Sequence, residues 1–261
     1  MSQQPELTLP PLMWGEAVPA AGRVQGAGLG AASAGEAVPG DAFGHAVRRA
    51  VLGCDAGLVA YHLGAASIEA ALVVAPELPL ARAMTMLPLC GVGFQNALGA
   101  LAPPEVAVHL EWPGAIRVNG ARRGGLRAMA AIDDPEATPD WLVIGLIVPI
   151  LPPSEDTGHA PDDTALLSEG CAEVDPPALL EAWARHTLSW LTRWEEDGPR
   201  ALHAEWRGLA HGIGEEITVA DAQGTPQTGT FLGTDEAFGL LLRQGETTSL
   251  NPLTTLLETA P

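Results

Sequence analysis

The chain contains no lysine, since all 13 residues in its lysine and arginine total are arginines. Mechanisms that need a lysine on this chain, such as a Schiff base, a P-loop phosphate clamp or an acylated acceptor amine, are therefore excluded. The 32 acidic residues bring the formal net charge to −19 over 261 residues. A chain this acidic repels phosphate backbones and anionic lipid surfaces, so we expect neither nucleic acid nor a membrane as a partner.

Cysteine is also scarce. Cys54, Cys90 and Cys171 fit no Cys-x-x-Cys or zinc spacing, their odd number argues against a disulfide framework, and no metal site is predicted. Residues 1–20 lack the basic and apolar regions of a signal peptide, and no stretch reaches the roughly 20 uninterrupted apolar residues of a membrane span. These observations predict a cytoplasmic protein.

Changes of pattern divide the chain into three parts. Residues 1–41 are rich in glycine, alanine and proline, which indicates an irregular N-terminal arm. Three of its glycines (Gly26, Gly28 and Gly30) mimic a dinucleotide fingerprint, but without the strand before and the helix after that this motif requires, so a plain loop is favoured. Residues 42–211 mix helical and strand patterns, whereas residues 212–261 consist of short strands and turns. The sum is an α+β domain followed by a small all-β domain.

Within the α+β domain the apolar periodicity predicts individual elements. The long helix begins at Pro176 and Pro177, ends at Gly198, and carries a tryptophan stripe that we interpret as packing. The continuously apolar residues 141–151 predict a strand covered on both faces. The other expected elements are helices at 43–52 and 81–101, a short helical patch at 165–169, and strands at 57–63, 69–77 and 105–112.

Four of the thirteen arginines gather in residues 109–128. The Asn-Gly pair at 119–120 predicts a two-residue hairpin turn that places Arg117 directly opposite Arg122. Because facing like charges destabilise a hairpin, we expect either a bound anion or carboxylates of the chain itself over the pair. The alternative is an exposed hairpin that its neighbours neutralise. Glycines at 124 and 125 indicate that a ligand or another backbone approaches closely.

The sequence "EWPGAIRVNGARRGGL", residues 111–126, resembles the signature of biotin protein ligases, a Lys-Trp-Pro-Asn-Asp strand end, a hairpin, and a second strand with a lysine, two small residues and an aliphatic residue. Residues 141–150 resemble that family's Gly-x-Gly-Ile-Asn strand, residues 179–206 its long helix, and residues 229–250 its C-terminal barrel. The resemblance covers roughly residues 70–250 in family order and extends to a ligase-like side branch of unassigned role.

The resemblance implies a mixed β-sheet with flanking helices, as in the catalytic domains of biotin and lipoate ligases and of class II aminoacyl-tRNA synthetases, plus a small C-terminal Src-homology-3-like β-barrel. It also implies binding of biotin or lipoate and of ATP with magnesium, formation of an acyl-adenylate, and transfer to a lysine of a biotin-carrier acceptor domain. Arg122 aligns with the family's hairpin lysine and is the candidate catalytic residue. The candidate substrate-binding residues are Trp112, Pro113, Arg117, Arg123, Gly124, Gly125 and Gly145.

The chain departs from the family pattern at several of these positions. Only Trp-Pro survives from the strand-end motif, in which Glu111 takes the place of the lysine, and Ile147 and Pro149 replace a glycine and an asparagine. The family's glycine- and arginine-rich loop, expected before residue 81, is missing. The departures favour a ligase-derived protein with a degenerate active site that binds a small carboxylate or adenylate-like anion without normal adenylation. The alternative is an active ATP-dependent biotin or lipoate protein ligase that uses Arg122 in place of the lysine.

Overall fold

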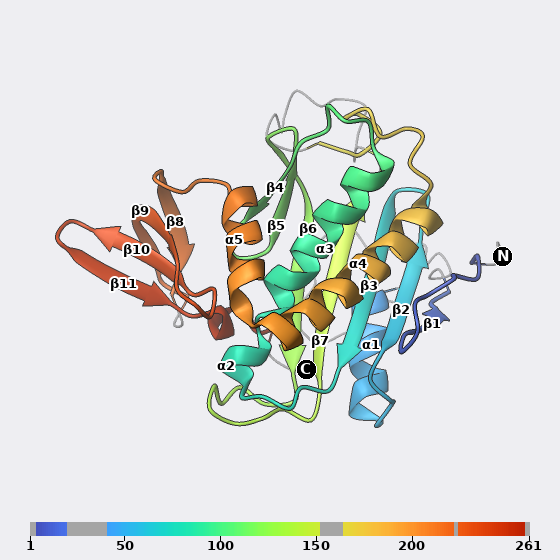
Figure 1. Cartoon of the computed structure of the whole chain (residues 1–261), viewed down its shortest axis with the longest axis horizontal. Helices are drawn as coiled ribbons and strands as arrows, with labels where there is room; N and C mark the ends of the chain where they lie inside the picture. Colours follow the sequence, from blue (N-terminus) through green and yellow to red (C-terminus); the bar gives the residue numbers. More distant parts are fainter. Residues whose placement is uncertain (1–3, 20–40, 152–163, 222–223, 259–261) are drawn as a thin grey trace, which may run out of the picture.

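A computed structural model describes residues 4–19, 41–151, 164–221 and 224–258, and contains the predicted mixed sheet with flanking helices (Figure 1). The sheet has seven strands in the order β1-β2-β3-β7-β6-β5-β4, in which β1 and β2 are parallel and the other neighbours antiparallel. The strands are β1 (Trp14–Ala17), β2 (Leu58–Leu63), β3 (Ser67–Val74), β4 (Val108–Glu111), β5 (Ala115–Val118), β6 (Ala121–Ala130) and β7 (Leu142–Pro149).

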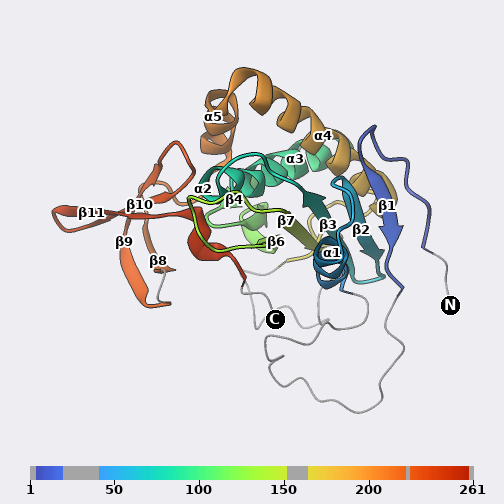
Figure 2. The same cartoon turned by 90° about the horizontal axis from the view of Figure 1, so that it is seen from below.

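Helices cover both faces of this sheet. Figure 2 shows α3 and α4 on one face and α1 on the other, with α5 continuing from α4 toward the C-terminal strands. Each face has its own buried apolar cluster, the larger one beneath α3 and α4. The helices are α1 (Ala42–Val51), α2 (Leu80–Ala83), α3 (Met86–Leu101), α4 (Pro176–Asp197) and α5 (Pro199–Leu209).

The tryptophans of α4 pack against α3, as the sequence predicts. The indole of Trp183 is buried and its Nε1 donates to the backbone oxygen of Cys90 at 3.1 Å. Trp190 Nε1 likewise donates to Asn96 Oδ1 at 2.7 Å. The segment Leu80–Leu101 is long and apolar enough to span a membrane by composition, but 72% of the relevant window is buried in the protein, which accounts for its apolar character.

Strand β7 lies at the centre of the sheet between β3 and β6. Its residues are buried on both faces, as predicted, except that Ile147 is 44% exposed and Pro149 is half-buried. Three local predictions differ from the structure. The predicted helix at 81–101 is divided into α2 and α3, with Met84 and Thr85 between them. Residues 165–169 form turns rather than a helical patch. Strand β1 lies within the arm that was predicted to be irregular. The sequence did not predict this strand, because its order comes from pairing with β2 and the local sequence does not encode that contact. The glycines of the apparent dinucleotide fingerprint fall outside the described residues.

The C-terminal residues form a separate antiparallel sheet in the order β11-β10-β9-β8, consistent with the predicted small β domain (Figure 1). Its strands are β8 (Glu216–Ala220), β9 (Pro226–Thr234), β10 (Leu240–Gln244) and β11 (Thr247–Asn251), followed by a 3-10 helix, η2 (Leu253–Leu256). Phe231 and Phe238 of this sheet are buried and join the larger apolar cluster of the main domain. The expected domain limits at residues 41/42 and 211/212 stay predictions.

Candidate functional site

The predicted hairpin is formed by β5 and β6. Asn119 and Gly120 both have positive φ, 50° and 91°, as a tight two-residue turn of this hand requires. The strand register pairs Arg117 with Arg122, which confirms the prediction that the two arginines face each other.

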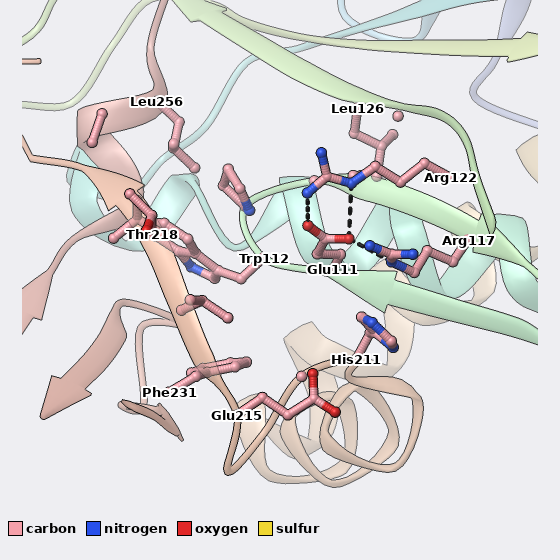
Figure 3. A pocket seen from close by; sticks show the side chains of 18 of the residues that line it. Glu111, Trp112, Arg117, Arg122, Leu126, His211, Glu215, Thr218, Phe231 and Leu256 are labelled. Atoms are coloured by element: carbon pink, nitrogen blue, oxygen red, sulfur yellow. Dashed lines mark hydrogen bonds and ion pairs between the residues drawn. The ribbon is translucent and has the colours of Figure 1, made fainter. Parts of the chain in front are cut away.

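A carboxylate of the chain itself, that of Glu111 at the end of β4, bridges the two arginines (Figure 3). Glu111 Oε2 accepts from Arg117 Nε at 2.5 Å and from Arg122 Nε at 3.0 Å, while its Oε1 accepts from Arg122 Nη2. We call these three residues the arginine–glutamate triad. Of the possibilities that the sequence leaves open, a carboxylate from elsewhere in the chain is the one that the structure contains.

The three side chains of the triad differ in how exposed they are and in how firmly they are held. The side chains of Glu111 and Arg117 are each 16% exposed, whereas that of Arg122 is 54% exposed. Arg117 is further held by a bond from its Nη1 to the backbone oxygen of Gly120 at 2.5 Å. Glu111 binds Nε and Nη2 of Arg122, so the third guanidinium nitrogen, Nη1, takes no part in this contact. Arg122 is therefore the triad member with the most surface open to a ligand.

The triad lies on one wall of a cleft of about 750 Å³ between the main sheet and the C-terminal sheet. Six of the predicted site residues line it, namely Trp112, Pro113, Arg117, Arg122, Gly124 and Gly125. The far wall contains side chains that local sequence patterns did not identify, because they reach the cleft only through the docking of the C-terminal sheet. The residues missed in this way include Glu215, Glu216, Asp221, Phe231 and Leu256. Local patterns also missed two lining residues held by the main sheet, namely Glu111 of β4 and His211, whose backbone nitrogen donates to the backbone oxygen of Leu110.

Trp112 joins the two sheets rather than presenting a free indole to the cleft. Its side chain is 5% exposed, and its Nε1 donates to the backbone oxygen of Phe238 at 3.0 Å. The ring of Phe238 in turn meets Trp206 of α5 edge to face at 5.9 Å. The surviving tryptophan of the strand-end motif thus helps to fix the geometry of the cleft.

The hairpin glycines allow backbones to approach closely. A Cβ on Gly124, whose φ is 88°, would lie 2.0 Å from the backbone oxygen of Ile147, and a Cβ on Gly125 would lie 3.0 Å from that of Gly114. Of the two alternatives predicted for these glycines, the close approach of another backbone is the one present, although both residues still line the cleft.

Two predicted site residues lie away from the cleft lining. Arg123 is 9% exposed and its Nη2 donates to the backbone oxygen of Leu151 at 3.3 Å. Gly145 faces α1, where a Cβ would lie 2.5 Å from Cδ2 of Phe43 and 3.1 Å from Cγ of Arg127. The guanidinium of Arg127 lies over the Phe43 ring, 4.1 Å from its centre. The space beside Gly145 is therefore filled by side chains of the chain itself.

The connection between β2 and β3 is short. Strand β2 ends at Leu63 and β3 begins at Ser67, so residues 64–66 make the whole turn. The resemblance implies a glycine- and arginine-rich loop somewhere in residues 64–80, and the structure has this turn, β3 and the connection 75–79 there. Within the described residues, no group of three or more histidine, cysteine, aspartate or glutamate side chains could hold a metal ion.

The chain is similar to known proteins of one family over most of its length. The model of the biotin/lipoate A/B protein ligase family matches residues 32–208, and the model of a domain of unknown function matches residues 213–259. No curated protein matches the chain. One similar structure is the crystal structure of a biotin protein ligase-like protein of unknown function from Silicibacter sp. TM1040. Its sequence is 57% identical to this chain, the TM-score of the two structures is 0.83, and the match covers 97% of this chain and 100% of that one.

More distant structures share the fold. Biotin protein ligase from Aquifex aeolicus is 16% identical with a TM-score of 0.65, covering 80% of this chain and 90% of its own. The complex of that enzyme with biotin and ATP is 17% identical with a TM-score of 0.60, covering 78% of this chain and 89% of its own.

Proposed function

The chain belongs to the biotin/lipoate A/B protein ligase family, and from that membership we propose that it binds a small carboxylic acid of the biotin or lipoate class without normal adenylation. The observation that carries this proposal is the arginine–glutamate triad. Two facing arginines on the wall of a ligand-sized cleft already hold one carboxylate, and Arg122 still exposes half of its side chain. Guanidinium groups bind carboxylates through paired, charge-assisted hydrogen bonds, so a second carboxylate at the outer edge of Arg122 has a suitable donor.

The remaining lining of the cleft supports a ligand with an apolar body. Leu126 lies beside the triad, and Ile217, Phe231 and Leu256 come from the C-terminal half. Ligand sites are typically apolar with a few placed polar groups that fix orientation. A carboxylate joined to a hydrocarbon or thioether body, as in biotin, lipoate or octanoate, matches this arrangement.

ATP with magnesium fits the described residues poorly. The cleft lining contains four carboxylates, those of Glu111, Glu215, Glu216 and Asp221, against the two guanidinium groups of the hairpin. A triphosphate would add several negative charges to this lining, and Glu111 already occupies the hairpin cations. We therefore derive no step that passes through ATP.

Two further features support the loss of normal adenylation. Residues 64–80, where the family resemblance implies a lid over the adenylate, contain β3 and two short connections, 64–66 and 75–79, without the family's glycine- and arginine-rich sequence. The space at Gly145, a matching position of the family pattern, is filled by Phe43 and Arg127. We propose a cytoplasmic location, in keeping with three free cysteines, and no nucleic acid or membrane as a partner.

The alternative function is an active biotin or lipoate protein ligase that uses Arg122 in place of the lysine, with a biotin-carrier domain as its acceptor. One observation favours it: the Arg122 side chain is 54% exposed on the cleft wall and keeps the positive charge of the family lysine. The two functions predict different products, so one set of measurements separates them.

The test is calorimetric titration of the full chain with biotin, lipoate, octanoate and ATP. We expect one of the three acids to bind, Arg122→Ala to abolish that binding, and Arg185→Ala, at an exposed site on α4, to leave it unchanged. Incubation with biotin, ATP, magnesium and a biotin-acceptor domain should give acyl transfer at background. Equal losses from the two arginine variants would contradict a specific site. Robust biotinylation that Arg122→Ala abolishes would establish the alternative.

A further inference from the structure

We infer that Glu111 determines which anions the cleft accepts, because it lets the hairpin arginines bind a singly charged carboxylate and reject phosphate groups. This inference rests on the proposed function in one respect, since it takes the cleft beside Arg122 as the ligand site. It assigns a role to a residue that the sequence marked only as a departure from the family pattern.

Glu111 is held in place within the triad. Both of its carboxylate oxygens are engaged, and its side chain is 16% exposed. Arg117, the partner that buries it, is itself held by the backbone oxygen of Gly120. Removing Glu111 from the contact would leave two facing arginines without an anion between them, which is unfavourable in a hairpin. Glu111 is therefore a permanent part of the cleft wall.

The net charge of the triad favours a singly charged ligand. Arg117 and Arg122 supply two positive charges and Glu111 removes one, so the triad carries a single net positive charge. A monocarboxylate matches that charge. A phosphate or pyrophosphate group carries more negative charge than the triad can balance, and Glu215 and Glu216 add further negative charge to the same cleft lining. In a partly buried site such an imbalance is screened less than in water.

The geometry of the remaining donor on Arg122 also favours a carboxylate. Glu111 binds the Nε and Nη2 side of Arg122 and leaves Nη1 directed away from this contact. A planar carboxylate can bind at that outer edge. The paired arginines would hold a tetrahedral phosphate best from between the two guanidinium groups, which is the position that Glu111 occupies. Charge and shape thus select against the same ligands.

The experiment replaces Glu111 with the uncharged glutamine of the same shape and measures binding of pyrophosphate by calorimetry. Wild-type protein should bind pyrophosphate weakly or not at all, and Glu111→Gln should bind it at least about tenfold more tightly, since the triad then carries two net positive charges. Adding Arg122→Ala to Glu111→Gln should remove the gain. Glu215→Gln is the matched control, because it removes the same charge from the same cleft without touching either arginine.

Two results would overturn the inference. One is a Glu111→Gln protein that binds pyrophosphate no better than wild type, and the other is an equal gain from Glu215→Gln, which would indicate general electrostatics. Thermal melting checks that each variant is folded, and Glu111→Ala replaces Glu111→Gln if the latter does not fold, with the same expected gain. A wild-type protein that binds no carboxylic acid contradicts the proposed function, whereas the pyrophosphate measurement tests Glu111 by itself.

Discussion

The hydrogen bond from Trp112 to the backbone of Phe238 connects the main sheet to the C-terminal sheet, and Trp112→Phe removes it while keeping an aromatic ring. The indole is 5% exposed and its Nε1 lies 3.0 Å from the accepting oxygen. The variant therefore leaves a buried carbonyl without its partner and replaces an indole with a smaller ring. Both changes act at the boundary between the two sheets.

The expected cost follows from these two losses. An unsatisfied buried carbonyl costs about 1–3 kcal/mol. A residual cavity of about 40 Å³, roughly the volume by which the rings differ, adds about 1 kcal/mol. The sum is a loss of about 2–4 kcal/mol in the free energy of unfolding, which corresponds to a decrease in melting temperature of about 5–15 °C for a chain of this size.

The assay combines thermal melting with limited proteolysis. Trp183→Phe is the matched control, because Trp183 is also buried and also donates to a backbone oxygen, that of Cys90, but within the main domain. Both variants should melt at lower temperature, and Trp112→Phe alone should be cleaved faster near residues 212–215, where the chain passes from α5 to β8. A melting temperature within about 1 °C of wild type, or equal cleavage in both variants, would refute the reasoning.

Three further outcomes are expected. Gly145→Ala should lower the free energy of unfolding by about 1–3 kcal/mol, because the new Cβ would lie 2.5 Å from Phe43; an unchanged urea midpoint would contradict this. Arg122→Lys should leave acyl transfer at background, since the hairpin cation stays beside the Glu111 carboxylate; mass spectrometry showing a biotinylated acceptor domain would refute it. Burial raises the pKa of the Cys90 thiol far above its ordinary value, so a thiol reagent should label Cys54 in the native protein and Cys90 only after unfolding. Because the pKa of Cys90 is higher in the folded than in the unfolded protein, keeping this thiol protonated stabilises the fold fully below about pH 9, and that stabilisation is lost as the pH rises further. Labelling of Cys90 in the native protein near pH 8 would contradict the prediction.

Local patterns predicted the elements whose order comes from nearby residues. The Asn-Gly turn set the register that brings Arg117 opposite Arg122, and Pro176 marks the start of α4. The apolar run of β7 predicted a strand buried on both faces, and Ile147 and Pro149 were the exceptions. In each case the physical cause lies within a few residues of the effect, so the sequence contains it.

The rest depends on contacts between distant segments. The partner of both arginines is Glu111, six residues before Arg117, and only the pairing of β4 with β5 brings it there. The exclusion of Gly145 from the cleft depends on Phe43, about a hundred residues earlier in the chain. The far wall of the cleft comes from the C-terminal sheet, which packs on the main domain and receives the hydrogen bond from Trp112 to Phe238. No local pattern encodes these long-range contacts, which is why the sequence predicted the candidates but not their grouping.

The shared carboxylate makes positions 111, 117 and 122 dependent on one another. A lysine at 111, as in the ligase pattern, would stand beside Arg117 and Arg122 and place three cations in one contact. Loss of either arginine alone would leave Glu111 with fewer donors at a site where it is 16% exposed. Replacing Glu111 alone, or one arginine alone, should therefore lower the free energy of unfolding more than replacing Glu111 and an arginine together. Replacing these residues by those of the ligase motif one at a time is therefore expected to pass through less stable proteins.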